Sequence, residues 1–516
     1  MFTMNNAMPK CMMSVGDKTC IEAILASYAG QVDKAYIVCL RQHAGLIAKL
    51  LEEKGVDKSF GTVDCIPIDP QPSALASIRA AFKLIHAKEA DAWYLNWSDV
   101  FADKVPRPAI NTIYTDTQYR HRNLAVMTGN DLVTCVSTSN LSGNVPGIFY
   151  TDTNSMLEAL AYDEEDFDKA ITEVAACKTL AMDVHDIGDY AKYTAFMTKR
   201  DTDSACRYFN RIEIKPTTVI KQAVTPLGVE LQRAEVDFYM TYGNRCGCMP
   251  KLISYDSAAN KIVLERVKGR TVQQALDKCV GSKAGKANRL ISKFKGAIAS
   301  LQALQPVEML DNEQDLRAAI MDELVSMLDK RVQPCKMLID TVILKNGIKS
   351  IEGKPIRPYE EVYNAVQAYV SEHIDQFHAC ITHGDTNTDN TMLSTQGEIK
   401  FIDPRGRFGK LKTAGLGFAE YDLAKFVYGM TGYSRFNSAS YIATEVKDGD
   451  LKVYLSEDED GGVEAISLDS LAVPDHIKVI VGIIWMKLTS YIINDPAKSV
   501  VAYLHGNAML TDLLNI

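Results

Sequence analysis

Two periodicities of hydrophobic residues alternate along the first hundred residues. Short apolar runs, typical of buried strands, occupy residues 35–40, 63–68 and 92–97. Between them, apolar residues recur every three or four positions, as on one face of a helix, and Ser73 is a suitable N-cap for the helix that runs to Ile85. Alternating strands and helices predict a parallel sheet covered by helices, which defines an α/β domain.

A different pattern begins near residue 200. A helix predicted from Pro226 through Glu235 to about Tyr242 is flanked by strand-like segments, which indicates a small, mostly antiparallel lobe. These strands are expected at residues 207–214, 217–224, 251–255 and 261–266. From Val272 onward the pattern is largely helical, with helices expected at residues 290–304, 316–328, 359–377 and 477–493. Three parts follow: residues 1–198, 200–270 and 271–516.

Composition narrows the classes of function. The 516 residues include 47% hydrophobic and 23% charged residues, as in globular rather than disordered proteins. The net charge of -9 gives no overall attraction to nucleic acid or to an anionic membrane. No secretory signal is visible near Met1, and the apolar stretch 479–486 ends at Lys487, too short to span a bilayer. We therefore expect a cytoplasmic protein with no nucleic-acid partner and no membrane insertion.

The 12 cysteines are scattered, and only Cys246 and Cys248 lie close together in sequence. A zinc site with four cysteine ligands needs a second such pair, which the chain lacks. The sequence therefore favours reduced, mostly buried thiols.

One segment near the C-terminal end carries the residue types that phosphoryl transfer requires. Asp385 and Asn390 lie in one loop, and the strand 399–402 leads directly to Asp403. A kinase needs a carboxylate to orient the accepting hydroxyl and oxygen ligands for magnesium beside the triphosphate. A loop with Asp385 and Asn390, followed by a hydrophobic strand that ends in Asp403, would bring the three side chains to one side of the turn between paired strands. The alternative is a polar hairpin with surface carboxylates.

The order of these motifs resembles the aminoglycoside phosphotransferase and choline kinase group, which has the bilobal protein-kinase-like α+β fold. His383-Gly384-Asp385 with Asn390 matches the catalytic loop of that group, Asp403 matches its metal-binding aspartate, and Tyr421-Asp422-Leu423-Ala424 is similar to the start of its next helix. The resemblance covers about residues 200–516. It implies ATP and Mg²⁺ as cofactors, Asp385 as catalytic base, Asn390 and Asp403 as magnesium ligands, and Asp422 as a loop-stabilising or substrate-facing residue.

The small lobe fits the same resemblance. Lys221 lies in a predicted strand and Glu235 in the next helix, the order of the lysine–glutamate pair that holds the α- and β-phosphates in kinases. Glu265 and Val267 end a strand and resemble the hinge that receives adenine through backbone groups. The segment 204–210, before Lys221, contains no glycine. Its Ser204, Arg207 and Asn210 are therefore only weak candidates for phosphate contacts.

Three short segments of residues 1–198 occur in a recognisable order: Met8-Pro9-Lys10, Ser98-Asp99 and the segment around Asp186. They resemble, in turn, the start, the metal-binding strand end and the closing segment of a Rossmann-like nucleotidyltransferase of the sugar-phosphate and phosphocholine cytidylyltransferase type. Residues 73–78 and 147–150 are similar to a helix and a core strand of that family. The resemblance implies that Asp99 and Asp186 bind Mg²⁺ and that Lys10 neutralises the triphosphate of CTP or UTP.

Members of that family cradle the triphosphate with a glycine-rich loop before the Pro-Lys segment, and this sequence shows no such loop before Pro9-Lys10. Only eight residues precede Pro9, and none of them is glycine. Either the chain starts late, or nucleotidyl transfer has been lost or altered. The leading hypothesis is a kinase of an amino alcohol, sugar or similar metabolite, fused to a domain that activates the product as a nucleotide derivative for a surface glycan or headgroup. The alternative is a kinase with a non-catalytic nucleotide-binding or scaffolding N-terminal domain. Antibiotic inactivation by the kinase ranks lower, and the acceptor and the oligomeric state stay open.

Overall fold

The computed structural model describes most of the chain. The described residues are 9–13, 15, 18–54, 62–85, 90–116, 123–128, 132–136, 144–163, 165–188, 192, 196, 210–224, 226–243, 245–279, 282–304, 313–408, 415–439, 442–455, 466–492 and 495–516. Two compact units are present. One extends from residue 8 to residue 203 with residues 494–496, and the other comprises the chain from residue 204 to 493 and from 497 to 516.

The first unit begins with the predicted alternation of helices and strands. Its first elements are α1 (Cys20–Ser27), β1 (Lys34–Leu40), α2 (Arg41–Lys54), β2 (Thr62–Ile68), α3 (Ala74–Phe82) and β3 (Ala92–Asn96). A capping box starts α1, in which Thr19 and Glu22 each bind the other's backbone N–H group. Ser73 caps α3 as expected, by accepting the N–H of Ala76. β1 and β2 pair in parallel.

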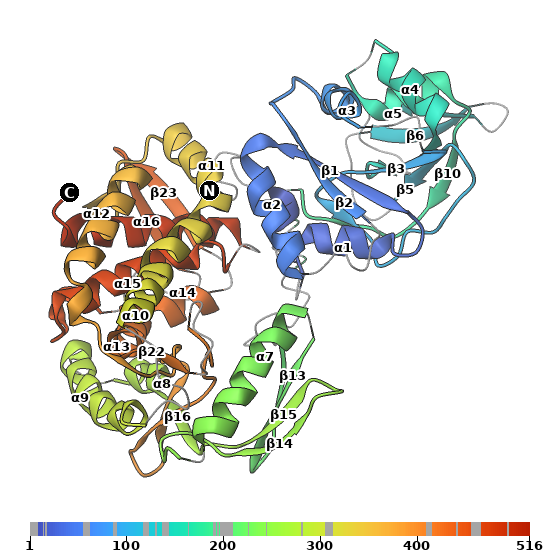
Figure 1. Cartoon of the computed structure of the whole chain (residues 1–516). Coiled ribbons are helices and arrows are strands. Elements are labelled where there is room, and N and C mark those ends of the chain that lie inside the picture. The colour runs from blue at the N-terminus through green and yellow to red at the C-terminus, as the bar shows by residue number, and fades with distance from the viewer. Residues whose placement is uncertain are drawn as a thin grey trace. The chain divides into compact units, whose positions relative to one another are not determined.

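The sheet is mixed rather than parallel throughout, which corrects the sequence-based expectation. β3 pairs antiparallel with β9 (Ile148–Asp152), which also pairs antiparallel with β5 (Thr112–Thr115), and β5 pairs in parallel with β10 (Lys178–Ala181). β3 therefore joins a sheet with partners from later in the chain, whereas β1 and β2 form a separate pair. The helices α4 (Thr153–Ala161) and α5 (Phe167–Val174) pack on this sheet around buried Phe149 and Phe167 (Figure 1).

Shorter strands complete this unit. A two-stranded sheet joins β4 (Val100–Phe101) to β11 (His185–Asp186), and a three-stranded sheet contains β6 (Asn123–Thr128), β7 (Leu132–Val136) and β8 (Asn144–Val145). The β4–β11 pair matters for the site, because it fixes the backbone next to Asp99 against that of Asp186.

The second unit opens with the predicted antiparallel sheet and helix. The sheet has the order β12 (Asn210–Ile214), β13 (Thr218–Ala223), β15 (Lys261–Glu265) and β14 (Leu252–Asp256). Helix α7 (Pro226–Phe238) runs beside it and is extended by a π-helical turn at Tyr239–Gly243 (Figure 1). The weak phosphate candidates Ser204 and Arg207 lie outside the described residues, and Asn210 opens β12.

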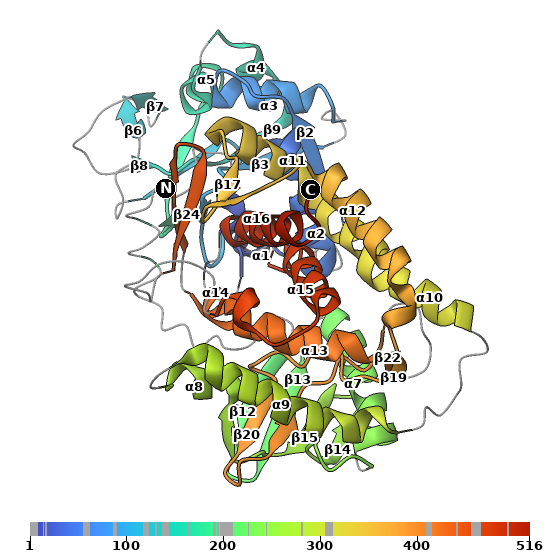
Figure 2. The same cartoon turned by 90° about the vertical axis from the view of Figure 1, so that its left-hand side faces the viewer.

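The remainder is mainly helical, as the sequence predicts. Its helices are α8 (Val272–Asp277), α9 (Lys283–Gln302), α10 (Glu313–Met321), α11 (Met327–Asn346), α12 (Tyr359–Glu372), α13 (Ala419–Tyr428), α14 (Ser434–Ser438), α15 (Asp475–Leu488) and α16 (Pro496–Leu513). α13 packs against α15, whose Trp485 is fully buried, and α16 lies beside α15 (Figure 2). Within the described residues, no helix combines the length and hydrophobicity that a bilayer crossing requires.

Three short sheets complete this helical part. They contain β16 (Gly269–Thr271) with β20 (Thr391–Ser394) and β21 (Ile399–Phe401), β19 (Ala379–Ile381) with β22 (Leu416–Phe418), and β17 (Ser350–Ile351) and β18 (Lys354–Pro355) with β23 (Ile442–Lys447) and β24 (Asp450–Leu455). The hairpin β20–β21 connects the loop of Asp385 and Asn390 to Asp403.

Several helix limits differ from the sequence-based expectation. The helix expected at 316–328 is interrupted by a π-helical turn at Asp322–Ser326, after which α11 continues to Asn346. The turn places two consecutive acidic residues, Asp322 and Glu323, in buried positions, which hydrophobic periodicity could not indicate. The helix expected at 359–377 ends at Glu372, with a 3₁₀ turn behind it.

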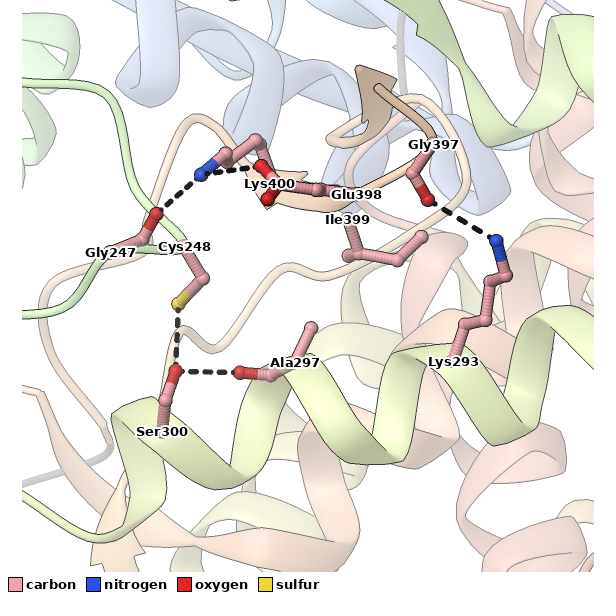
Figure 3. Close-up of a pocket in the computed structure, with 9 residues that line it drawn as sticks. All are labelled: Gly247, Cys248, Lys293, Ala297, Ser300, Gly397, Glu398, Ile399 and Lys400. Atoms are coloured by element: carbon pink, nitrogen blue, oxygen red, sulfur yellow. Dashed lines mark hydrogen bonds and ion pairs between the residues drawn. The ribbon is translucent and has the colours of Figure 1, made fainter. Parts of the chain in front are cut away.

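Cys246 and Cys248 form a disulfide, which corrects the expectation of reduced thiols for this pair. Their Cα atoms are 5.4 Å apart, a separation that a disulfide bridges. The turn that carries them lines a surface pocket together with α9 and the β20–β21 hairpin (Figure 3). Lys400 reaches the carbonyl oxygen of Gly247, and Lys293 reaches that of Gly397. The pocket contains none of the predicted site residues.

Candidate active sites

The loop after β19 is fixed by two buried side chains. Asp422, at the start of α13, is inaccessible to solvent and accepts the backbone N–H groups of His383 and Gly384 at 3.0 and 2.7 Å. Burial raises the pKa of Asp422 to about 7. The imidazole of His383 is also buried, which lowers its pKa to about 4, so the ring is neutral near pH 7 and its Nδ1 lies 3.3 Å from the backbone nitrogen of Asp385. Asp422 therefore stabilises the loop.

The carboxylate of Asp385 is held on both sides. Its Oδ1 lies 3.0 Å from Nζ of Lys425, one turn along α13 from Asp422. Its Oδ2 accepts a hydrogen bond from Nδ2 of Asn390 at 2.9 Å, and Nδ2 of Asn387 lies 3.3 Å from Oδ1. An ion pair and two amides thus fix the orientation of one carboxylate.

Asn390 and Asp403 are connected through the backbone. The N–H group of Ile402, next to Asp403, donates to the carbonyl oxygen of Asn390 at 2.9 Å. Asp403 adopts a left-handed conformation with φ 62°, which is uncommon for a residue other than glycine and recurs at functional sites. Its side chain is 46% exposed and so remains accessible to a ligand.

These two residues suit a magnesium ion. Mg²⁺ prefers oxygen ligands and is commonly bound by one or two protein side chains together with substrate phosphates and waters. The carboxylate of Asp403 and the amide oxygen of Asn390 supply such ligands, while the amide nitrogen of Asn390 is engaged by Asp385. In the described part of the chain, no three or more His, Cys, Asp or Glu side chains are grouped to hold a metal ion by themselves.

Lys221 lies between two carboxylates. Its Nζ is 2.6 Å from Glu235 Oε2 on α7, and it also contacts Oδ1 of Asp403. Burial would lower the pKa of Lys221, but the charges of Asp403 and Glu235 outweigh it and raise the pKa, so the amine carries a positive charge. The predicted lysine–glutamate pair is therefore formed, beside the aspartate at the end of β21.

A glycine allows α7 to approach this aspartate closely. Gly406 has φ +73°, and a Cβ atom at this position would lie 2.1 Å from the carbonyl oxygen of Ala234 and 2.9 Å from the backbone nitrogen of Glu235. No other residue fits there without displacing α7. The segment after Asp403 thus packs directly on the helix turn that carries Glu235.

The predicted hinge lies at the end of β15. The N–H group of Glu265 donates to the carbonyl oxygen of Lys251 at 2.9 Å, and that of Arg266 donates to Thr217. These two amides therefore belong to the sheet. Val267 follows the strand, and its N–H group has no backbone acceptor among the described residues. Of the two predicted positions, Val267 is the better placed to donate a hydrogen bond to a base.

The first unit also brings its predicted site residues together. Nζ of Lys10 lies 3.5 Å from Asp99 Oδ2 and donates to the carbonyl oxygen of Gly188. A Cβ atom on Gly188 would lie 3.0 Å from an oxygen of Asp99 and 3.0 Å from one of Asp186, so Gly188 separates two neighbouring carboxylates. Lys192 forms an ion pair with Asp186. Two aspartates and two lysines therefore meet at one place.

Sequence reasoning missed Lys425 and Lys192. Lys425 is the residue directly after the segment Tyr421–Ala424 that the sequence analysis identified. Because it lies four residues after Tyr421, the two residues share one face of α13. Helical spacing could have suggested it. Lys192 lies six residues after Asp186 and outside any regular element that the sequence predicts, so no periodic signal marks it.

Comparison with known proteins gives matches to solved structures alone. No protein-family model and no curated protein sequence matches the chain. The choline kinase LicA from Streptococcus pneumoniae is 14% identical, with a TM-score of 0.33, over 59% of this chain and 90% of that protein. The aminoglycoside phosphotransferase APH(2″)-IIa in its gentamicin complex is 12% identical, with a TM-score of 0.32, over 63% of this chain and 99% of that protein.

A solved structure of a different class is also similar. UDP-glucose pyrophosphorylase from Acinetobacter baumanii is 14% identical, with a TM-score of 0.29, over 39% of this chain and 89% of that protein. The structures similar to this chain thus include small-molecule kinases and a sugar nucleotide pyrophosphorylase. At TM-scores of 0.33 or less, these likenesses carry no argument about activity. The contacts described above are the basis for the proposals below.

Proposed function

We propose that the second unit is an ATP-dependent kinase that phosphorylates a hydroxyl group of a small metabolite. One observation carries the proposal: five residues from β13, α7, the loop after β19 and the end of β21 form one connected set of contacts. They are Lys221, Glu235, Asp385, Asn390 and Asp403, and each has the chemical type that its role demands. The alternative, in which Asp385, Asn390 and Asp403 belong to an ordinary polar hairpin, does not explain these contacts. It gives no reason for Lys221, which pairs with the buried Glu235, also to contact Asp403.

Each residue has a defined role in the reaction. Asp385 orients the acceptor hydroxyl and accepts its proton as the oxygen bonds to the γ-phosphorus of ATP and the bond to the β-phosphate oxygen breaks, releasing ADP. Lys221, held by Glu235, neutralises the α- and β-phosphates. Asn390 and Asp403 would hold Mg²⁺, which supplies charge neutralisation to the β- and γ-phosphates. The backbone at Val267 would receive the adenine.

The decisive experiment is a comparison of the protein with its Asp385→Asn variant. Both are incubated with ATP, Mg²⁺ and a panel of amino alcohols, sugars and aminoglycosides, and ADP formation is measured. The expected result is acceptor-dependent ADP formation that the variant reduces by about 10³-fold or more. Equal turnover by the two proteins would remove Asp385 from its role. Glu398→Gln, on the β20–β21 hairpin outside the site, is the matched control.

For the first unit we propose a nucleotide-binding site at Lys10, Asp99, Asp186 and Lys192. Two neighbouring carboxylates can share a magnesium ion, and the lysines can neutralise a triphosphate, so the site suits CTP or UTP. In the bifunctional form of the proposal, this unit converts the phosphorylated product into a nucleotide-activated derivative for a surface glycan or lipid headgroup. The alternative is that it binds nucleotide without catalysis.

Pyrophosphate release distinguishes these two forms. The full chain is incubated with CTP or UTP, Mg²⁺ and the phosphorylated product of its own kinase reaction. Nucleotidyl transfer is supported if pyrophosphate is released only when the phosphorylated product is present and if substitution of Asp99 abolishes the release. Magnesium-dependent nucleotide binding without pyrophosphate release supports the non-catalytic form.

A further inference from the structure

The disulfide between Cys246 and Cys248 adds little to the stability of the fold. A disulfide stabilises a protein mainly by closing a loop in the unfolded chain, and the effect grows with the length of that loop. Here only Gly247 lies between the two cysteines, so the bond joins no distant parts of the chain. The stability of the fold therefore does not account for this bond.

Backbone contacts hold the turn that carries the disulfide. The N–H group of Cys246 donates to the carbonyl oxygen of Tyr242 at 3.2 Å, and the carbonyl oxygen of Cys248 accepts the N–H group of Phe401, in β21, at 2.7 Å. Neither contact uses a sulfur atom. The turn can therefore stay bound to β21 while the disulfide opens and closes.

A small molecule can reach the disulfide from the surface pocket. Cys248 lines this pocket, which has a volume of about 380 Å³ (Figure 3). Cys246 and Cys248 are only 4% and 6% exposed to solvent, whereas Gly247 between them is exposed, and a Cβ atom on Gly247 would meet no atom within 4 Å. A pocket of this size admits a small molecule, and the low exposure of the two cysteines disfavours attack by a folded protein. The site therefore suits a small thiol.

A hydroxyl group lies beside both sulfur atoms. Oγ of Ser300, on α9, is 3.5 Å from Sγ of Cys246 and 3.6 Å from Sγ of Cys248 (Figure 3). The same oxygen lies 2.8 Å from the carbonyl oxygen of Ala297, to which it can donate while the disulfide is closed. A hydroxyl hydrogen can rotate, so Ser300 can donate instead to a sulfur atom that leaves with a negative charge.

Two lysines bring positive charge to the same place. Nζ of Lys400 donates to the carbonyl oxygen of Gly247 at 2.6 Å and lies 3.2 Å from the carboxylate of Glu398. Lys293 lines the pocket as well, with Nζ 3.2 Å from the carbonyl oxygen of Gly397. Nearby amines stabilise a thiolate, which is the form of cysteine that attacks a disulfide and the form that leaves when one opens.

We propose that Cys246 and Cys248 form a redox-active disulfide that exchanges with small thiols in this pocket. A thiolate attacks Sγ of Cys248, the bond between the two cysteine sulfurs breaks, and Cys246 leaves as a thiolate that takes up a proton. A second thiolate then attacks the sulfur of the bound thiol, which releases Cys248 and yields the disulfide of the small thiol. Two electrons pass from the thiols to the protein, and the reverse reaction restores the disulfide. The site shares no residue with the proposed kinase site, so the inference does not depend on the proposed function.

A redox titration of the full chain tests whether the disulfide is reversible. The protein is equilibrated with mixtures of reduced and oxidised glutathione, and free thiols are trapped with N-ethylmaleimide. Trypsin cleaves after Arg245 and Lys251 and so releases residues 246–251 as one peptide, which mass spectrometry quantifies. The expected result is a change from the disulfide to two trapped thiols across the series. A peptide that stays a disulfide in every mixture, or stays a dithiol in every mixture, would overturn the proposal.

Two single variants test which sulfur atom the thiol attacks. Cys246→Ser leaves Cys248, which lines the pocket, and Cys248→Ser leaves Cys246, which does not. With oxidised glutathione, the 246–251 peptide of Cys246→Ser is expected to gain glutathione about tenfold or more faster than that of Cys248→Ser. Equal rates, or a faster reaction of Cys246, would contradict attack at Cys248. Thermal unfolding checks that both variants fold, and the titration of the unaltered protein depends on neither of them.

Discussion

Lys425 and Asp385 form an ion pair, with 3.0 Å between Nζ and Oδ1, although forty residues separate them in sequence. The pair directs one oxygen of the proposed base toward α13 and brings a positive charge to the place where the proposed reaction would transfer the phosphoryl group. Lys425 is therefore expected both to position Asp385 and to stabilise the charge that develops during the reaction.

We predict that Lys425→Met lowers kcat by about 10²-fold while changing the KM for ATP little, because its charge acts at the reacting centre. Steady-state kinetics with a turned-over acceptor measure both constants. Lys425→Arg, which keeps the charge, should recover part of the lost activity, and Lys345→Met, an exposed lysine of α11, should behave as the unaltered protein. A purely structural role would instead show as a lowered melting temperature with an unchanged kcat.

Glu235→Gln should weaken ATP binding. The substitution removes the charge that holds Lys221 on α7, so Lys221 keeps Asp403 as its remaining anionic neighbour and is displaced from the phosphates. We expect about a tenfold rise in the KM for ATP. Glu230→Gln is the matched control, since Glu230 lies on the same helix with an exposed side chain paired to Arg407. The same KM for both variants would argue against the role of Glu235.

Asp186→Asn should weaken magnesium-dependent binding of CTP or UTP by about tenfold, because one of the two neighbouring carboxylates loses its charge. Calorimetry on the full chain, with the kinase site first saturated by an ATP analogue, isolates this binding. Asp183→Asn, three residues earlier and exposed, serves as the control. Kinase activity should be unchanged in both variants, and binding of CTP and UTP that survives in Asp186→Asn would contradict the proposed site.

The buried imidazole of His383 should make stability depend on pH. Its pKa falls from 6.5 to about 4 in the folded protein, so the unfolded chain binds more protons between these values and folding loses stability as the pH falls through this window. The loss by pH 4 is about 3 kcal/mol, since one pKa unit corresponds to about 1.4 kcal/mol.

His383→Asn isolates this contribution, because asparagine keeps an acceptor for the N–H group of Asp385 and does not titrate. Denaturant unfolding at pH 7 and at pH 4 should show the free-energy advantage of the unaltered protein over the variant decreasing by about 3 kcal/mol on acidification. Taking the difference between the two proteins removes the opposite trend of Asp422. An advantage that is constant with pH would show that folding does not lower the pKa of the His383 ring.

The sequence predicts locally encoded features well. The helices and strands of the first hundred residues follow from hydrophobic spacing and from caps such as Ser73, and the residues around Asp385 and Asp403 follow from motif order. Hydrophobic spacing and helix caps do not indicate which strands from distant parts of the sequence pair with one another. The insertion of β9 between β3 and β5 depends on the whole unit and could not be predicted from the pattern within each strand.

The burial of charged residues such as Glu323 could not be predicted from the sequence either. Glu323 appears in the sequence as an ordinary acidic residue of a helix, and its burial results from a π-helical turn that no periodicity predicts. The residues that contact Glu323 come from α13, α15 and the segment after Asp403. These contacts become visible only when the elements are assembled.

The contact of Gly406 with the backbone of α7 has a consequence for control of the enzyme. Because Gly406 is separated from Asp403 by two residues and packs on the turn that carries Glu235, one continuous packing contact holds both Asp403, the proposed magnesium ligand, and the partner of Lys221. An off-state made by swinging α7 outward would have to break this contact. We therefore expect a kinase that is permanently assembled, whose output is set by the supply of its acceptor rather than by a helix that switches between two positions.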